Sequence, residues 1–276
     1  MTAARPGLLR VVTINTGKCD GRYRDRLNAL LAGLAALDAL DADIILAQEA
    51  FEALDAPRAP ALSTPRHLAD GLGMHLAFHP IRHKPRDVEG VTVDSVSGLA
   101  TLSRWPLGDV TTVALTDDPE DGDRAALFVE VPTPDGVVRT ANTHLTHLRH
   151  RDDLRVQQAR EILDHPWWHG EGALRLLGGD MNARDGHEVH TLVRGGDTPW
   201  TGSDAFDAAG DPARSATIRR EAPGGVIEAR LDYLYLLEPS GTPAPAVAGA
   251  RVVLDSPLGD VLPSDHFGVL ADIRLG

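Results

Sequence analysis

The feature that most constrains the fold of this chain is a strand, a helix and a second strand within residues 8–49. Residues 8–15 (LLRVVTIN) are apolar and β-branched, which predicts a buried strand ending at Asn15. Residues 24–40 carry leucines at 27, 30, 31, 34 and 37, the spacing of an amphipathic helix. Residues 43–48 (DIILAQ) predict a second buried strand, with Glu49 immediately after it. Strands joined by a helical crossover usually run parallel, so Asn15 and Glu49 are expected at one edge of a sheet.

Strands outnumber helices in the rest of the chain. Apolar runs between turn signals predict strands at 75–79, 97–104, 110–115, 125–131, 137–144, 176–179, 231–237, 247–254 and 267–273. Helices are expected at 151–163 and 186–193, and the remainder of 52–95 and of 195–225 is expected to form loops. About ten strands with two or three helices predict an α/β sandwich, in which helices cover two packed sheets.

Composition favours a protein that folds without disulfides or membrane insertion. The chain has 276 residues, 42% of them hydrophobic, and no long Pro/Gly/Ser-rich linker, so we expect one domain over 1–276. Cys19 is the only cysteine, which excludes an intramolecular disulfide and a cysteine-rich zinc site. No apolar run approaches the ~20 residues of a membrane span. We expect a cytoplasmic location, and secretion after removal of a signal peptide stays open.

Residues 176–183 (LLGGDMNA) predict a buried strand that ends in a functional site. Asp180 and Asn182 follow two glycines and stand two residues apart, so on an extended segment their side chains would point the same way. Their oxygens suit a hard cation such as Mg²⁺, or a phosphate held beside one. The same residues are equally typical of a turn, in which their side chains would bond their own backbone.

Other polar residues stand at or near the ends of predicted strands. They are Asn15, Glu49, His144, Asp232, Asp265 and His266. A strand-end Asn or Asp commonly caps a turn, and a lone histidine is more often a satisfied core or surface residue than a catalyst. All eight residues, taken in order, are harder to explain as turn caps alone.

In this order the segments resemble the endonuclease/exonuclease/phosphatase superfamily, metal-dependent phosphoesterases that include deoxyribonuclease I, exonuclease III, neutral sphingomyelinases and inositol-polyphosphate 5-phosphatases. The matching segments run from residue 9 to 273: TINTG with Asn15, LAQEA with Glu49, SGLATLSR at 97–104, NTHL with His144, GGDMNA with Asp180 and Asn182, LDYL with Asp232, and SDHFGV with Asp265 and His266. The resemblance implies a four-layer α/β sandwich of the deoxyribonuclease I type, two packed mixed sheets flanked by helices, with the site at one edge.

The resemblance also implies a cation site. A divalent ion, most often Mg²⁺ but with Mn²⁺ or another ion open, would be held by Glu49 with help from Asn15 and Asp265. Such an ion would supply the positive charge that polarises a phosphoryl oxygen and stabilises the leaving oxygen.

The remaining residues would then carry the catalytic roles. His266, oriented by Asp232, would take a proton from the attacking water. Asp180 and Asn182 would position that water and the phosphate, and His144 would donate a hydrogen bond or a proton to the phosphoryl group. The roles of Asp180 and His266 could be exchanged, because mechanisms in the family are argued both ways.

The substrate is less constrained than the chemistry. Enzymes of the exonuclease III type carry a tyrosine where this chain has His144, which counts against abasic-site DNA repair. A balance of 27 Lys+Arg against 40 Asp+Glu, formally -13, opposes a surface that tracks duplex DNA. A small or lipid-borne phosphoester is therefore expected, and a Mg²⁺-dependent endonuclease or exonuclease acting on DNA or RNA is the alternative. A non-catalytic binding protein on the same fold would lack some of the eight residues, and none is missing.

Two histidines and two tryptophans stay open at this point. His147 and His150 follow His144 on a predicted loop, where they either reach the substrate or are simply solvated. Trp167 and Trp168 could belong to the core, contact lipid peripherally or stack on a substrate.

Overall fold

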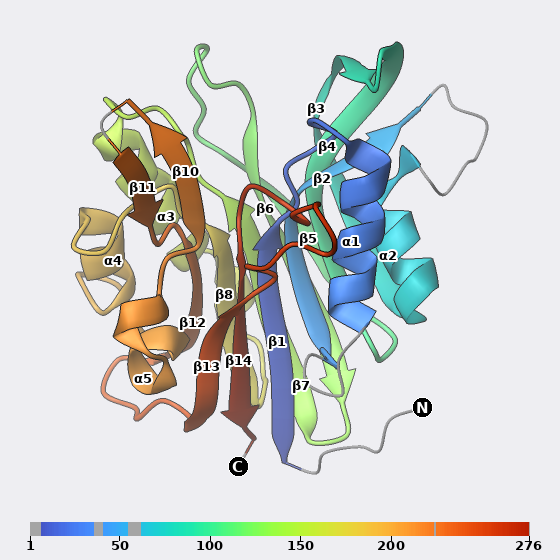
Figure 1. Ribbon diagram of the computed structural model, residues 1–276. Helices are drawn as coiled ribbons and strands as arrows, with labels where there is room; N and C mark the ends of the chain where they lie inside the picture. Colours follow the sequence, from blue (N-terminus) through green and yellow to red (C-terminus); the bar gives the residue numbers. More distant parts are fainter. Residues whose placement is uncertain (1–6, 36–40, 55–61, 224, 276) are drawn as a thin grey trace.

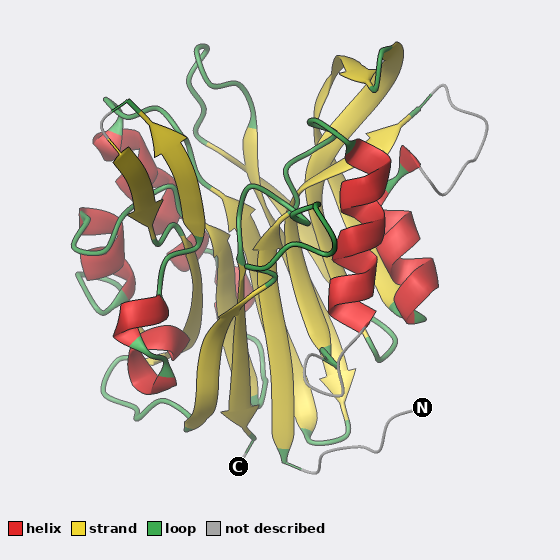
Figure 2. Cartoon of the chain, in the orientation of Figure 1, coloured by secondary structure: helices red, strands yellow, loops and turns green. Residues whose placement is uncertain are grey.

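Two β-sheets packed face to face form the centre of the computed structural model, which describes residues 7–35, 41–54, 62–223 and 225–275 (Figure 1). Helices cover the outer face of each sheet (Figure 2). This is the predicted four-layer α/β sandwich with two mixed sheets, and the prediction of fold class is confirmed. Within the described residues, no helix is long and apolar enough to cross a membrane.

The first sheet has the order β13-β14-β1-β2-β4-β3. Its strands are β1 (Leu8–Asn15), β2 (Ile44–Ala53), β3 (His75–Val88), β4 (Val91–Ser103), β13 (Val247–Val253) and β14 (Gly268–Arg274). Helix α1 (Tyr23–Ala35) connects β1 to β2, and these two strands are parallel, with Asn15 opposite Gln48. The strand-helix-strand unit predicted from the sequence is therefore confirmed.

The second sheet has the order β5-β6-β7-β8-β12-β9. Its strands are β5 (Val110–Leu115), β6 (Arg124–Thr133), β7 (Gly136–His144), β8 (Leu174–Asp180), β9 (Trp200–Asp204) and β12 (Asp232–Pro239). Helix α3 (Asp152–Leu163) connects the parallel strands β7 and β8. Their register places Asp180 opposite His144 on one side and opposite Asp232 of β12 on the other.

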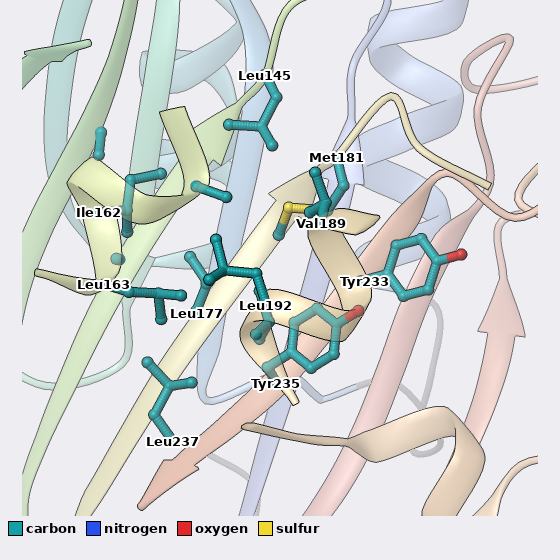
Figure 3. Packing of buried hydrophobic residues seen from close by; sticks show 14 of the residues in the cluster. Leu145, Ile162, Leu163, Leu177, Met181, Val189, Leu192, Tyr233, Tyr235 and Leu237 are labelled. Atoms are coloured by element: carbon teal, nitrogen blue, oxygen red, sulfur yellow. The ribbon is translucent and has the colours of Figure 1, made fainter. Parts of the chain in front are cut away.

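Three apolar layers hold the sandwich together. Leu9, Val11, Leu127 and Leu176 belong to the layer between the two sheets. Helices α1 and α2 (Thr64–Leu72) cover the first sheet through a second layer. Helix α3 and α4 (Glu188–Val193) cover the second sheet through residues such as Leu177 and Leu192, seen in Figure 3. Alternate residues of each strand thus face opposite layers, as expected for sheets buried on both sides.

Two regions that the sequence predicted to be mainly loops contain strands and helices. Residues 75–103 form the long hairpin of β3 and β4, where only short strands were expected. The region 195–225 contains β9, α5 (Ala205–Ala209), a short 3₁₀ helix at Pro212–Arg214 and β10 (Ile218–Ala222), which pairs with β11 (Gly225–Ala229). A second 3₁₀ helix spans Pro166–His169. Of the helix predicted over 24–40, residues 36–40 lie outside the described residues.

Candidate active site

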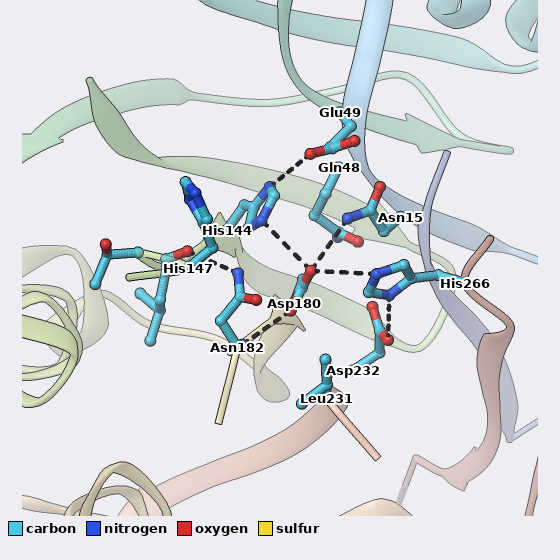
Figure 4. A network of polar contacts seen from close by, with 12 residues as sticks. Asn15, Gln48, Glu49, His144, His147, Asp180, Asn182, Leu231, Asp232 and His266 are labelled. Atoms are coloured by element: carbon cyan, nitrogen blue, oxygen red, sulfur yellow. Dashed lines mark hydrogen bonds and ion pairs between the residues drawn. The ribbon is translucent and has the colours of Figure 1, made fainter. Parts of the chain in front are cut away.

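Asp180 is the hub of a polar network at the ends of the central strands (Figure 4). One carboxylate oxygen, Oδ2, accepts a hydrogen bond from Asn15 Nδ2 at 3.1 Å. The same oxygen lies 3.4 Å from His144 Nε2 and 3.8 Å from His266 Nε2. The parallel pair of each sheet contributes to this meeting point, because Asn15 ends β1 while His144 and Asp180 end β7 and β8.

Asp232 fixes the orientation of His266. Its Oδ2 lies 2.8 Å from His266 Nδ1, which leaves Nε2 facing Asp180. The backbone N–H groups of Leu231 and Asp232 donate to Thr217 Oγ1, which anchors the start of β12. Asp232 is fully buried, and its Oδ1 has no hydrogen-bond partner among the described residues. This unpaired buried oxygen indicates room for a water or an ion at the site.

The charges of the network shift its protonation equilibria. Burial, and after it the charge of Asp232, raise the pKa of Asp180 to about 7, while His266 opposes the rise. Burial alone would lower the pKa of His266, but the charges of Asp232 and Asp180 raise it to about 10. The pKa of His144 is well below its usual value, because of burial first and then because of the charges of Arg124 and Lys18. His144 is therefore neutral and can donate a hydrogen bond, whereas His266 carries a proton in the absence of a cation.

Glu49 lies inside β2 on a β-bulge, and the expectation that it follows the end of a strand is wrong. The pairing of β2 with β4 shifts between Ala47 and Ala50, and Glu49 has a φ of 54°. A bulge inserts an extra residue and turns its side chain, which the strand pattern alone does not reveal. Glu49 Oε1 lies 2.6 Å from Lys18 Nζ and 3.9 Å from His144 Nδ1. Glu49 thus places a carboxylate beside the network, and this carboxylate forms an ion pair with Lys18.

The structure places Asn182 in one of its two expected conformations and Asp265 at the surface. Asn182 has a φ of 47°, its N–H donates to Asp180 Oδ1 and its Nδ2 donates to Leu145 O, so it forms the turn considered from the sequence. Asp265 is exposed, and a Cβ on Gly17 would lie 2.8 Å from its Oδ1. Its carboxylate accordingly lies against the loop that follows β1.

The residues present fit a hard divalent cation. Asp180, Asp232 and His266 each offer one ligand atom, and these atoms lie within 4.8 Å of one another. Glu49 offers a second position, on the other side of His144. Carboxylates dominate both positions, and oxygen ligands are those that Mg²⁺ and Mn²⁺ prefer. Asn15, which the resemblance gives as a cation ligand, donates a hydrogen bond from Nδ2 to Asp180. Its Oδ1 accepts a hydrogen bond from the N–H of Gly17.

The residues left open by the sequence have distinct places. His147 Nδ1 lies 2.7 Å from Asp121 Oδ1, and His150 is 65% exposed with Glu120 as its neighbour. Trp168 is fully buried in the core beneath α3, and Trp167 is partly buried under the guanidinium of Arg139. Both tryptophans therefore serve packing.

Sequence reasoning missed four charged residues that adjoin the network. They are Lys18, Arg82, Asp121 and Arg124. Lys18 stands close to Asn15 in the chain, a proximity that could have marked it. The other three lie in or near predicted loops and strands without any motif, and only the tertiary fold brings them together.

Comparisons with known proteins agree with this fold. The model of the Endonuclease/Exonuclease/phosphatase family matches residues 12–266. An endonuclease/exonuclease/phosphatase from Beutenbergia cavernae has a similar structure, with 24% identity, a TM-score of 0.70 and coverage of 98% of this chain and 72% of that chain. A family protein from Leptotrichia buccalis shows 15% identity, a TM-score of 0.71 and coverage of 96% and 99%. D. rerio TDP2 complexed with a single strand DNA product shows 16% identity, a TM-score of 0.69 and coverage of 97% and 99%. No curated protein matches the sequence.

Proposed function

The chain belongs to the endonuclease/exonuclease/phosphatase family, and from this membership we propose that it is a divalent-metal-dependent phosphoesterase that uses an activated water. Family members hydrolyse phosphoester bonds and generally depend on a metal ion. One observation carries the proposal, namely the convergence of Asn15, His144 and His266 on a single oxygen of Asp180. An amide and two imidazoles around a buried carboxylate form a polar centre that can hold a phosphate and a water together.

In the proposed reaction, His266 and Asp180 handle the proton of the attacking water. Asp232 holds the imidazole of His266 so that Nε2 faces Asp180, and either group can accept the proton at that gap. The pKa of each group is raised in the cation-free site, to about 7 for Asp180 and to about 10 for His266. His144 is neutral and would donate from its ring N–H to a phosphoryl oxygen. Asn182 would support Asp180 through its backbone N–H.

A divalent cation would bind at Glu49 or between Asp180 and Asp232. When bound, it supplies positive charge that polarises the phosphoryl group and stabilises the leaving oxygen. Glu49, Asn15 and Asp265 stay the proposed ligands from the family resemblance, and the cluster of Asp180, Asp232 and His266 is the alternative from the geometry.

We propose a small or lipid-borne phosphoester as the substrate, because the chain carries a net charge of -13. Likeness to D. rerio TDP2 with its single strand DNA product supports the alternative, a nuclease, to the same degree. Both substrates require the same chemistry, so only turnover can separate them.

A panel assay tests the proposal directly. Hydrolysis of bis-p-nitrophenyl phosphate, plasmid DNA, RNA and sphingomyelin would be measured with Mg²⁺, with Mn²⁺ and with excess EDTA. We expect turnover only with a divalent ion, and loss of turnover in a folded Glu49→Gln variant. Full activity in EDTA would disprove the metal dependence.

The salt dependence of cleavage tests the substrate class. Turnover of a soluble phosphodiester is expected to change little with salt. Plasmid nicking that exceeds turnover of every small or lipid phosphoester, and that collapses between ~50 and 200 mM salt, would establish the nuclease.

A further inference from the structure

A hollow beside Glu49 and His144 contains positive charge that the proposed mechanism does not use. Its polar lining residues include Lys18, Glu49, Arg82, Asp123, Arg124 and His144. Its three positively charged side chains, Lys18, Arg82 and Arg124, come from three separate parts of the chain. We call this hollow the β4 pocket, because Ser97, Gly98 and Leu99 of β4 line it.

Two β-bulges direct side chains into the β4 pocket. Strand β4 lies between β2 and β3, and Gly98 pairs with Ala50 on one side and with Pro80 on the other. The register of β2 shifts just before Ala50, and that of β3 shifts just after Pro80. Bulges redirect the side chains they carry. Glu49 and Arg82 therefore enter one hollow from opposite neighbours of the same strand.

A buried carboxylate holds two guanidinium groups at the pocket wall. Asp121 is 1% exposed, and its Oδ1 lies 2.8 Å from Arg82 Nη2 and 2.7 Å from Arg124 Nη2. The backbone carbonyl of Asp123 accepts a bond from Arg82 Nε, which leaves Nη1 of Arg82 without a partner in the described part of the chain. One carboxylate thus orients two fixed positive charges, and the guanidinium of Arg82 has donors to spare.

A further guanidinium lies behind the pocket. Arg86 is buried, and it donates from Nη2 to Ser97 Oγ at 2.7 Å and from Nη1 to Ser95 Oγ at 2.9 Å. Among the described residues it has no carboxylate partner, and its Nε has no hydrogen-bond partner. A buried positive charge without a counterion favours an anion nearby.

The carboxylates of the pocket do not neutralise this charge. Asp123 is exposed at the rim, where water screens it. Glu49 pairs with Lys18, and a divalent cation at Glu49 would replace the ammonium of Lys18 as its partner. With the cation bound, Lys18 and Arg82 would both be available to an anion in the pocket.

We propose that the β4 pocket binds a second phosphate group of the substrate, beside the phosphoester that is cleaved. This inference rests on the proposed function and narrows its substrate class to phosphoesters that carry a neighbouring phosphate on the same molecule. Hydrogen bonds to a charged group in a partly buried site are strong enough to change affinity by about tenfold or more. Arg82 is the residue whose loss should remove this preference most directly.

Matched substrates test the proposal. Thymidine 5′-(p-nitrophenyl phosphate) would be compared with the same compound carrying a 3′-phosphate, in wild type, Arg82→Gln and the control Arg66→Gln. Arg66 is an exposed arginine on α2 that pairs with Glu52, so its loss removes one surface charge away from the pocket. We expect the 3′-phosphate to lower KM by about tenfold or more in wild type and control. In Arg82→Gln the two KM values should be nearly equal, with kcat for the simpler substrate changed less than about threefold.

Binding without turnover separates this pocket from the proposed activity. Titration calorimetry in the presence of Ca²⁺ would measure binding within two pairs of ligands. The first pair is thymidine 3′,5′-bisphosphate and thymidine 5′-monophosphate, and the second is inositol 1,4-bisphosphate and inositol 1-phosphate. The first pair tests a nucleotide as the source of the second phosphate, and the second pair tests a polyol. A bisphosphate advantage in either pair that is lost in Arg82→Gln supports the pocket, even if no phosphoester is hydrolysed and the proposed function fails. Equal binding within both pairs in wild type, or an advantage that survives in Arg82→Gln, overturns it. If Arg82→Gln fails to fold, Lys18→Gln replaces it, with the same expected loss.

Discussion

The two sheets have the same plan, yet they supply opposite halves of the candidate site. Each places one parallel pair at its centre, β1 with β2 and β7 with β8. The second sheet delivers Asp180, Asp232 and His144 in regular register from three neighbouring strands. The first sheet delivers Glu49 from a bulge, paired with Lys18 and facing a pocket with positively charged side chains. Regular pairing thus positions the residues of the second sheet, and an irregularity in the pairing positions Glu49 of the first.

Removal of His266 should have the largest effect, because it breaks the half that handles the proton. His266→Ala is expected to lower kcat by about 10² to 10⁴-fold with a smaller change in KM. Asp232→Asn should do similar harm, since it frees the ring that it orients. His150→Ala, an exposed histidine, serves as the control. Turnover within a few-fold of wild type in either test variant would rule out the dyad.

Loss of Asp121 should have the next largest effect, and this effect should be a lower free energy of unfolding. Asp121→Asn leaves the buried guanidinium of Arg124 without its counterion and is expected to lower the free energy of unfolding by about 3 kcal/mol. Asp260→Asn, which removes an exposed partner of Arg22, should leave the free energy of unfolding close to that of wild type. Urea unfolding of the three proteins measures both values. Equal midpoints for the two variants would show that Asp121 does not hold the pocket wall.

A methyl group at Gly98 should disturb the bulges of β2 and β3. Its Cβ would lie 1.9 Å from the carbonyl oxygen of His79, so the backbone of β3 must shift. Gly98→Ala is expected to cost about 1–3 kcal/mol of stability. Gly249→Ala on β13, where a Cβ meets no atom within 4 Å, is the matched control. Thermal unfolding that places both variants at the same midpoint would contradict the close approach at Gly98.

The last effect is a pH dependence of stability in the cation-free protein. The folded-state pKa of His266 is about 10, above its unfolded value of 6.5, so its stabilising contribution is complete below about pH 6.5 and disappears toward pH 10. The pKa of Asp180 is raised to about 7, so the stability that its protonated form contributes is lost between about pH 4 and 7. The stability difference between wild type and His266→Ala in EDTA should therefore shrink from pH 6 to pH 10. A difference that grows over this range would contradict the protonated state of His266.

Most of the second sheet and the centre of the first could be predicted from sequence, because their strands are buried on both sides. Residues 8–15 were predicted to the boundaries of β1, which is buried along nearly its whole length. Strand β3 was predicted only over 75–79, and the rest of this edge strand was expected to be a loop. Its polar sequence with Pro80 and Pro85 is acceptable at an edge, where one side of the backbone needs no partner. Hydrophobic periodicity is weak in such strands.

The candidate site was predictable where it depends on the strand order and unpredictable where it depends on irregularity. Asp180 and Asp232 are neighbours because of regular pairing, His266 reaches Asp232 from the segment just before β14, and the motif order pointed to all three. The roles assigned to them stay predictions. Glu49 was named from the sequence but without its bulge, and Arg82 was not named, because a one-residue insertion in pairing leaves no mark in the hydrophobic pattern.

The antiparallel pairing of β1 with β14 joins strands that are far apart in the sequence, and it runs from Leu8 and Arg274 to Thr13 and Val269 (Figure 1). Pairings over such a long separation in sequence are slow to form, because the chain must first close a long loop. His266 stands just before β14, so the pairing that places β14 also brings His266 to Asp232. A folding intermediate in which β1 and β14 are still unpaired therefore lacks the assembled pair of Asp232 and His266.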